Sequence, residues 1–119
     1  MTTSGGPASM RFQLHEVLSG MLASIEADSF SDNTMNLAAM FENLATRFPL
    51  FAPLAAGVDT AAVGKALEKL EANKYIEHGD GRYVLTKSGR SYCVSNKRTL
   101  FNKADADQLE EAAQVFNTL

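Results

Sequence analysis

The chain has 119 residues, of which 45% are hydrophobic and 21% charged, with a formal net charge of −3 and a single cysteine, Cys93. This length supports one domain, and the composition excludes a chain that is disordered throughout. One cysteine excludes an intramolecular disulfide, and no apolar run approaches the roughly 20 residues that span a bilayer. The first residues show no basic stretch followed by an apolar run, so we expect a soluble, cytoplasmic protein that binds no membrane.

The N-terminal part of the chain predicts a tail followed by one helix. Residues 1–9 consist largely of Ser, Thr, Gly and Pro, and we expect them to be disordered. Apolar residues then recur at helical spacing, which predicts a helix over 10–27. The members of this stripe are Met10, Leu14, Val17, Leu18, Met21 and Ile25. Residues 28–33 are mainly polar and break the pattern.

A second helix is predicted over 34–48, because apolar residues again recur along one helical face. These residues are Leu37, Met40, Phe41, Leu44 and Phe48. Pro49 ends this helix, since proline lacks the amide hydrogen that a helix interior requires. Residues 50–56 are compatible with one short helix that carries Pro53 in its first turn. Gly57 would then form the turn into the next element.

The segment 59–73 predicts a third helix with one buried face. Apolar residues at i, i+3, i+4 and i+7 define that face, namely Val63, Ala66, Leu67 and Leu70. Asp59 is placed to cap the helix by accepting hydrogen bonds from its first amides. Asn73 is the expected exit, because asparagine tolerates a left-handed backbone conformation.

A β-hairpin and two further helices complete the prediction. Residues 75–77 and 82–86 are rich in β-branched and aromatic side chains, and Gly79-Asp80-Gly81 between them supplies the positive φ angles of a tight turn. Thr86 can cap a helix that continues to about residue 96, and a last helix is predicted over 104–118. The expected fold is therefore mainly α-helical with a small β-hairpin.

The order of these motifs resembles the winged helix-turn-helix regulators of the MarR, PadR and ArsR type. The resemblance covers about 40 residues, from Gly57-Val58 through Leu67-Glu68-Lys69-Leu70-Glu71 and the Gly-Asp-Gly-Arg hairpin tip to Leu85-Thr86-Lys87-Ser88-Gly89-Arg90. It implies that residues 10–119 form a single winged-helix domain. It also implies that the helix 59–73 is the recognition helix and that the hairpin 75–86 is the wing.

This resemblance implies a transcriptional regulator that binds double-stranded DNA, with the recognition helix in the major groove and the wing on the backbone or the minor groove. The expected contacts are Thr60, Ala61, Gly64, Lys65, Lys69, Arg82, Lys87 and Arg90. Small side chains let the helix backbone approach base edges, and basic side chains bind phosphates. Residues 60–103 hold nine basic and four acidic residues, a local charge of +5.

A second hypothesis remains open, in which the winged helix is a protein–protein interaction module that does not bind DNA and the acidic half of the chain docks a partner. The mixed Glu68, Lys69 and Glu71 surface and the negative overall charge favour it. In either case the apolar stripes on 10–27 and 104–118 exceed what a small winged helix needs, which predicts a homodimer. Its two-fold axis is expected near Leu14, Leu18, Met21, Leu109 and Phe116.

No catalytic or metal-binding motif is recognised, and we expect neither an enzyme nor a cofactor. His15 and His78 lie far apart in the sequence, with no cysteine or carboxylate at the spacing of metal ligands. Ser88 lacks the Gly-x-Ser-x-Gly context of a nucleophile elbow, and a capped helix start explains it. The sequence identifies neither a small-molecule effector nor an operator.

Overall fold

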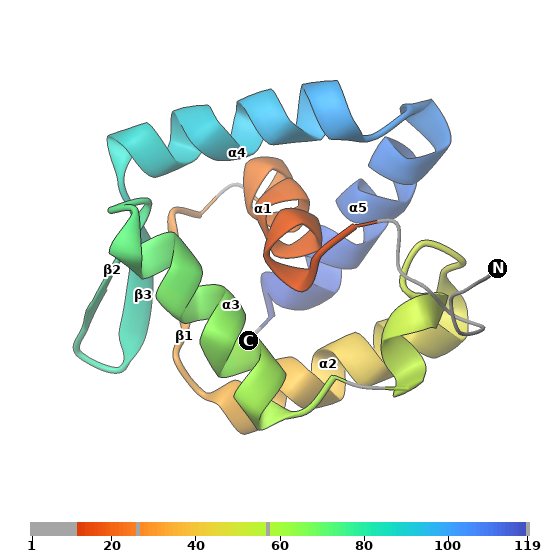
Figure 1. Cartoon of the computed structure of the whole chain (residues 1–119), viewed down its shortest axis with the longest axis horizontal. Helices are drawn as coiled ribbons and strands as arrows, with labels where there is room; N and C mark the ends of the chain where they lie inside the picture. Colours follow the sequence, from red (N-terminus) through yellow and green to blue (C-terminus); the bar gives the residue numbers. More distant parts are fainter. Residues whose placement is uncertain (1–11, 26, 57, 119) are drawn as a thin grey trace, which may run out of the picture.

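The computed structural model describes residues 12–25, 27–56 and 58–118, so the predicted tail 1–9 lies outside the described residues. Within them the chain forms five α-helices, one 3-10 helix and a three-stranded antiparallel sheet (Figure 1). In chain order these are α1 (Leu14–Ser24), β1 (Ser29–Ser31), α2 (Thr34–Arg47), η1 (Ala52–Ala56), α3 (Thr60–Ala72), β2 (Ile76–Gly79), β3 (Arg82–Leu85), α4 (Lys87–Leu100) and α5 (Lys103–Phe116). The mainly helical fold with a small hairpin is confirmed.

Helix starts follow the local chemistry of the sequence. The Asp59 carboxylate accepts a hydrogen bond from the Ala62 amide at 2.8 Å, and the Thr86 hydroxyl accepts one from the Gly89 amide at 3.0 Å. Asn33 and Asn102 cap α2 and α5 in the same way. Each cap satisfies an amide that has no partner inside its helix, so the predicted caps of α3 and α4 are confirmed.

The region before α2 differs from the prediction. The first helix ends at Ser24, and residues 29–31 form a strand, β1, which pairs with β3 so that Phe30 lies opposite Tyr83. Phe30 is buried and stacks on the Tyr83 ring. A three-residue strand of Ser-Phe-Ser is too short to show a sequence periodicity. Its formation depends on a partner strand more than 50 residues away in the chain, which the local sequence does not reveal.

The hairpin has a two-residue turn rather than a three-residue one. Gly79 belongs to β2 and pairs with Arg82, while Asp80 and Gly81 adopt positive φ angles of 55° and 74°. Two successive residues in this conformation match the right-handed twist of the flanking strands. The sheet order β1-β3-β2 places β3 in the centre, so the hairpin is anchored to the rest of the fold through β1.

The predicted exit of α3 at Asn73 is confirmed, but the left-handed conformation lies one residue later. Asn73 has φ −90°, and Lys74 carries the left-handed conformation with φ 65°. The Lys74 amide donates to the Glu71 carbonyl and the Tyr75 amide to the Leu70 carbonyl. This pair of bonds is a Schellman motif, in which the residue after the cap is the left-handed one.

This geometry leads to the first testable prediction. Lys74→Gly should raise the free energy of unfolding by about 0.5–1 kcal/mol, because glycine adopts a positive φ without the steric cost of a Cβ. Lys69→Gly, five residues earlier inside α3, removes the same side chain and should lower stability by about 1 kcal/mol. Urea unfolding of both variants measures the two signs, and a destabilised Lys74→Gly protein would contradict the assignment.

The core is built around α1, which lies between α3, α4 and α5 (Figure 1). Glycine lets α1 and α5 approach closely, since a Cβ at Gly20 would lie 2.7 Å from a methyl group of Leu109. The predicted face of α3 is confirmed, because Val63, Ala66, Leu67 and Leu70 are all buried. Cys93 is also buried, on the inner side of α4.

The prediction that the terminal helices leave their apolar stripes uncovered is wrong. Leu18, Met21, Leu109 and Phe116 are each at most 1% exposed within a single chain. The stripes are covered because α1 and α5 pack on each other and α4 packs on α1. These residues therefore belong to the core of one protomer. Homodimerisation stays a prediction, now without an assigned surface.

Candidate nucleic-acid interface

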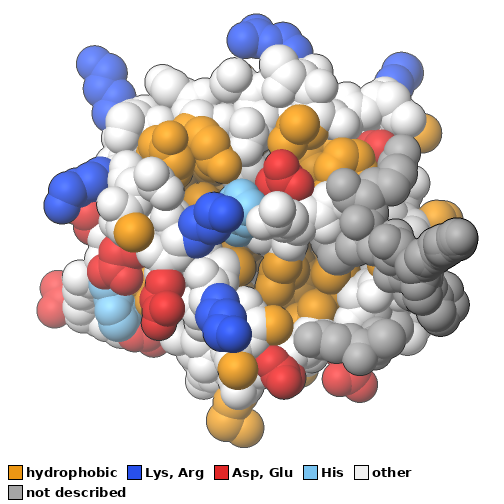
Figure 2. All heavy atoms as spheres, viewed as in Figure 1, with side chains coloured by type: hydrophobic (Ala, Val, Ile, Leu, Met, Phe, Trp, Pro, Cys, Tyr) orange, Lys and Arg blue, Asp and Glu red, His pale blue; other side chains and the backbone are white. Residues whose placement is uncertain are grey.

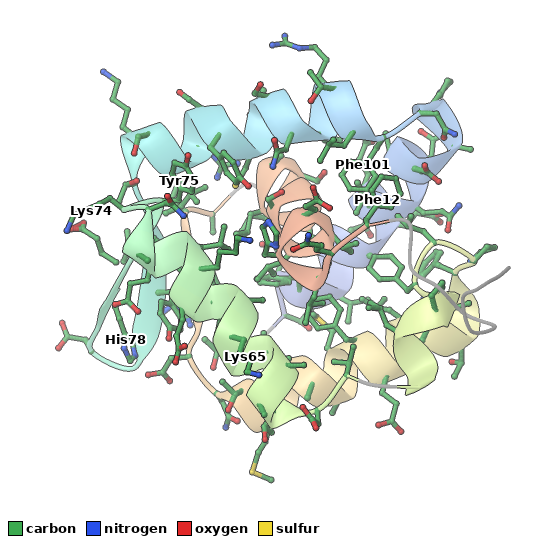
Figure 3. The ribbon with its side chains drawn as sticks, in the orientation of Figure 1. Phe12, Lys65, Lys74, Tyr75, His78 and Phe101 are labelled. Atoms are coloured by element: carbon green, nitrogen blue, oxygen red, sulfur yellow. The ribbon has the colours of Figure 1, made fainter. Side chains whose placement is uncertain are left out.

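The outward side of α3 is the candidate recognition surface. Five residues on the side away from the buried face are exposed, namely Ala61, Lys65, Glu68, Lys69 and Ala72. A Cβ added at Gly64 would meet no atom within 4 Å, so the α3 backbone is accessible there. Thr60 is exposed at the first position of the helix. Figure 3 shows Lys65 projecting from the front of α3, away from the core.

The hairpin lies next to this helix and is held by side-chain contacts. The Arg82 guanidinium donates through Nε to the Ser29 hydroxyl at 3.2 Å, which connects β3 to β1. His78 lies on β2 (Figure 3), with its ring stacked on Tyr83 and its Nε2 atom 2.7 Å from an Asp32 carboxylate oxygen. These contacts hold the hairpin against β1 and the residue that follows β1, while both Arg82 and His78 remain exposed.

The junction between β3 and α4 explains the Leu-Thr-x-x-Gly-Arg motif. Leu85 is buried, and the Thr86 amide donates to the Tyr75 carbonyl at 3.0 Å. The Thr86 hydroxyl also donates to the Lys74 carbonyl at 2.7 Å. Gly89 faces Tyr75, where an added Cβ would collide with the backbone. These contacts therefore hold the start of α4 against the residues that follow α3.

Arg90, the last residue of this motif and a predicted DNA contact, has its guanidinium engaged within the fold. One guanidinium nitrogen donates to the Leu22 carbonyl at 2.7 Å, and another forms an ion pair with Asp28. The side chain is partly buried between α4 and the end of α1. We therefore assign Arg90 to the fold, where it satisfies a carbonyl near the end of α1. Lys87, at the first position of α4, is exposed.

The charge of the predicted basic segment is unevenly divided. Residues 59–86, which contain α3 and the hairpin, hold four basic and five acidic residues, a net charge of −1. Residues 87–103 hold five basic residues and no acidic one. Figure 2 accordingly shows basic and acidic side chains interspersed over α3 and the hairpin. Most of the +5 charge of residues 60–103 therefore belongs to α4 and little of it to α3 and the hairpin.

A groove of about 260 Å³ runs beside α3, where the start of α1 approaches it. It is lined by Gln13, Leu14, His15, Ala62, Lys65, Ala66 and Lys69. Burial lowers the pKa of His15, and the positive charge of Lys69 lowers it further, against the opposing effect of Glu16. The sequence does not reveal this groove, because it depends on the tertiary packing of α1 against α3.

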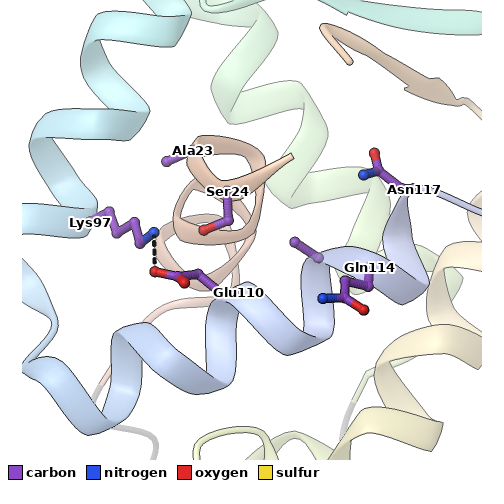
Figure 4. Close-up of a pocket in the computed structure, with 7 residues that line it drawn as sticks. Ala23, Ser24, Lys97, Glu110, Gln114 and Asn117 are labelled. Carbon is purple, nitrogen blue, oxygen red and sulfur yellow. Dashed lines mark hydrogen bonds and ion pairs between the residues drawn. The ribbon is translucent and has the colours of Figure 1, made fainter. Parts of the chain in front are cut away.

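A second pocket, of about 390 Å³, lies between the end of α1 and the helices α4 and α5 (Figure 4). Its lining is polar and includes Ser24, Gln114 and Asn117. Lys97 and Glu110 form an ion pair at its rim, with Nζ and Oε2 3.1 Å apart. The two charged side chains of the pocket therefore neutralise each other rather than presenting a charge to a ligand.

The described residues offer little for covalent or metal chemistry. Burial raises the pKa of Cys93 to about 12, so its thiol stays protonated at neutral pH and is a poor nucleophile. Within residues 12–25, 27–56 and 58–118, no three His, Cys, Asp or Glu side chains gather as metal ligands. In the same part of the chain, no helix combines the length and apolar character needed to span a bilayer.

Comparison of the chain with protein-family models, with curated proteins and with solved structures finds no match. The resemblance to winged-helix regulators therefore rests on the residues of segment 57–90 alone. What the structure adds is the arrangement of that segment, in which α3 contacts β2 and the hairpin that follows it (Figure 1).

Proposed function

We propose that the protein is a winged-helix DNA-binding regulator that inserts α3 into the major groove of duplex DNA. The observation that carries the proposal is the accessible small-residue face of α3, with Ala61 exposed and open space at Gly64, in a helix that is followed by an anchored hairpin. Only three residues separate α3 from β2, so the helix and the proposed wing are close neighbours.

The dimensions of α3 suit this role. Thirteen residues give a helix about 20 Å long, and the major groove is about 12 Å wide, which admits an α-helix. At Gly64 the backbone can approach base edges closely, and the methyl group of Ala61 can contact a thymine methyl. Lys65 and Lys69 lie on the same exposed side, where they can contact phosphates at the groove edges.

The hairpin supplies the wing contact in this proposal. The guanidinium of Arg82 is exposed and is oriented by the Ser29 hydroxyl, which leaves its two terminal nitrogens available for a phosphate or the minor groove. The Thr60 hydroxyl at the start of α3 adds a further hydrogen-bond donor for a phosphate. Arg90 is omitted from the proposed contacts because Leu22 and Asp28 occupy its guanidinium.

A second candidate function is a protein–protein module that binds no DNA. The net charge of −1 on residues 59–86 favours it, because DNA binding gains most of its non-specific affinity from uncompensated basic side chains. Under this alternative the acidic part of the chain, outside residues 60–103, would contact the protein partner. The two functions differ in the salt dependence that they predict.

The test is a fluorescence-anisotropy titration of the full chain with random duplex DNA at several salt concentrations. A plot of log affinity against log salt has a negative slope for DNA binding. Under the DNA hypothesis, Lys65→Ala and Arg82→Ala should each reduce the magnitude of this slope by about 0.9, because each removes one phosphate contact. Lys103→Ala removes the same charge from the start of α5 and serves as the control. Lys103 is exposed and lies beside Asp107.

Two outcomes would contradict the DNA hypothesis. A parent protein without salt-dependent binding would favour the protein–protein module. Equal effects of Lys65→Ala, Arg82→Ala and the Lys103→Ala control would show that α3 and the hairpin are not the binding surface. Glu42→Gln, on α2 and away from the proposed surface, should change affinity little because its charge is screened beyond roughly 8 Å.

A further inference from the structure

Helix α4 carries basic residues and no acidic one. From residue 81 to residue 104 the sequence contains six basic residues and no Asp or Glu. Four of the basic residues lie within α4 itself. Such a stretch of 24 residues without a carboxylate contrasts with α3 and the hairpin, where acidic side chains slightly outnumber basic ones.

The basic residues of α4 divide into two sets by their position around the helix. Arg90 and Lys97 lie on its flanks and form ion pairs with Asp28 and Glu110. Lys87 and Arg98 lie on the side opposite the buried Cys93, and both are exposed. The charges of the first set are compensated within the fold, whereas the second set faces outward.

The outward face of α4 is formed by five exposed residues at helical spacing, Lys87, Ser91, Val94, Ser95 and Arg98. We call it the α4 face. It contains two cations, two hydroxyl groups and one apolar side chain. The helix lies along one edge of the molecule and packs mainly on α1 (Figure 1). Figure 2 shows basic side chains projecting from that edge.

We propose that the α4 face binds the sugar–phosphate backbone of duplex DNA, at a surface separate from α3 and the hairpin. Lys, Arg and Ser side chains are the groups that proteins use for backbone contacts. The five residues of the face include no carboxylate, and the exposed Asp28, which lines a pocket with Lys87 and Ser91, is ion-paired with Arg90. Lys87 and Arg98 are 11 positions apart, which places them about 16 Å apart along the helix axis. That distance covers several phosphates of one strand, which are spaced by about 3.4 Å along the DNA axis.

The composition of the α4 face favours a nucleic acid over a protein partner. The centre of a protein interface is usually apolar and rich in aromatic side chains. Here the only large apolar side chain is Val94, which is flanked by serines. This inference goes beyond the proposed function, because α4 lies along a different edge from α3 and the hairpin (Figure 1).

The experiment compares two charge-matched double variants by anisotropy with a random duplex at several salt concentrations. Lys87→Ser/Arg98→Ser should reduce the magnitude of the slope of log affinity against log salt by about 1.8, because two phosphate contacts are lost. Arg47→Ser/Lys103→Ser removes the same charge from other exposed positions and should change the slope much less. Equal effects of the two double variants would overturn the inference.

A second measurement separates the α4 face from the α3 surface. Backbone amide resonances of the full chain are followed by NMR during titration with the same duplex. The inference expects shifts at Ser91, Val94 and Ser95, whether or not residues of α3 also shift. Shifts confined to α3 and the hairpin would overturn the inference and leave the proposed function standing. Shifts confined to α4 would support the inference and contradict the proposed role of α3.

A final arm of the experiment uses vesicles of anionic phospholipid in place of DNA, because a basic helix face can also bind a charged membrane surface. The inference expects the Lys87→Ser/Arg98→Ser substitution to reduce binding to duplex DNA. Vesicle binding that depends on these residues, without binding to duplex DNA, would overturn it.

Discussion

Replacement of Gly89 by alanine is expected to lower the free energy of unfolding by at least about 3 kcal/mol. A Cβ at this position would lie 2.7 Å from the Tyr75 carbonyl carbon and 2.9 Å from its Cα, and still closer to the carbonyl oxygen. All three atoms are backbone, so no flexible side chain can move aside. The helix must shift, and the Thr86 contacts with Lys74 and Tyr75 are then lost.

The sign of this effect distinguishes packing from helix propensity. Within a helix, glycine to alanine usually stabilises by about 1 kcal/mol. Gly64→Ala on α3 is the matched control, because a Cβ there meets nothing within 4 Å, and it should stabilise by roughly that amount. Urea unfolding measures both variants. A Gly89→Ala protein as stable as the parent would mean that α4 does not dock against Tyr75 as described.

The sequence predicts the helices well where local chemistry decides the structure. Asp59 and Thr86 cap α3 and α4 as expected, and the buried face of α3 follows from the spacing of its apolar residues. These features depend on residues within a few positions of each other, so a single segment contains the necessary information.

The errors arise where a residue's role depends on a distant partner. Strand β1 exists because it pairs with β3, and Arg90 is occupied because α4 docks against Leu22 and Asp28. The apolar stripes of α1 and α5 predicted a dimer, but these two helices pack on each other within one chain. An apolar stripe predicts burial, but it does not say whether the covering surface belongs to the same chain.

The candidate site shows the same division between local and tertiary information. The exposure of Lys65 and Lys69 follows from the α3 register and is predictable. The local charge of +5 was a sum over 44 consecutive residues, and the fold separates those residues onto α3, the hairpin and α4. Because screened charges act only over about 8 Å, the grouping in space rather than in sequence decides which surface attracts phosphates.

Leu70→Ala is expected to lower the free energy of unfolding by about 2–5 kcal/mol, through lost burial and the cavity that remains. Leu70 is 1% exposed and lies on the α3 face that packs against α1 and α2. A small domain has only about 5–15 kcal/mol of stability in total, so this loss is a large fraction. The effect should extend to the hairpin, because the Leu70 carbonyl accepts the Tyr75 amide at the end of α3.

Lys69→Ala is the control for this prediction, since the side chain of this preceding residue is exposed, and its stability change should stay within about 0.5 kcal/mol. Chemical unfolding gives both values, with an unchanged denaturant slope as evidence that the unfolded state is the same. A loss below about 1 kcal/mol for Leu70→Ala would contradict the register of α3. The outward positions of Ala61, Gly64 and Lys65, on which the proposed DNA contacts depend, would then also be wrong.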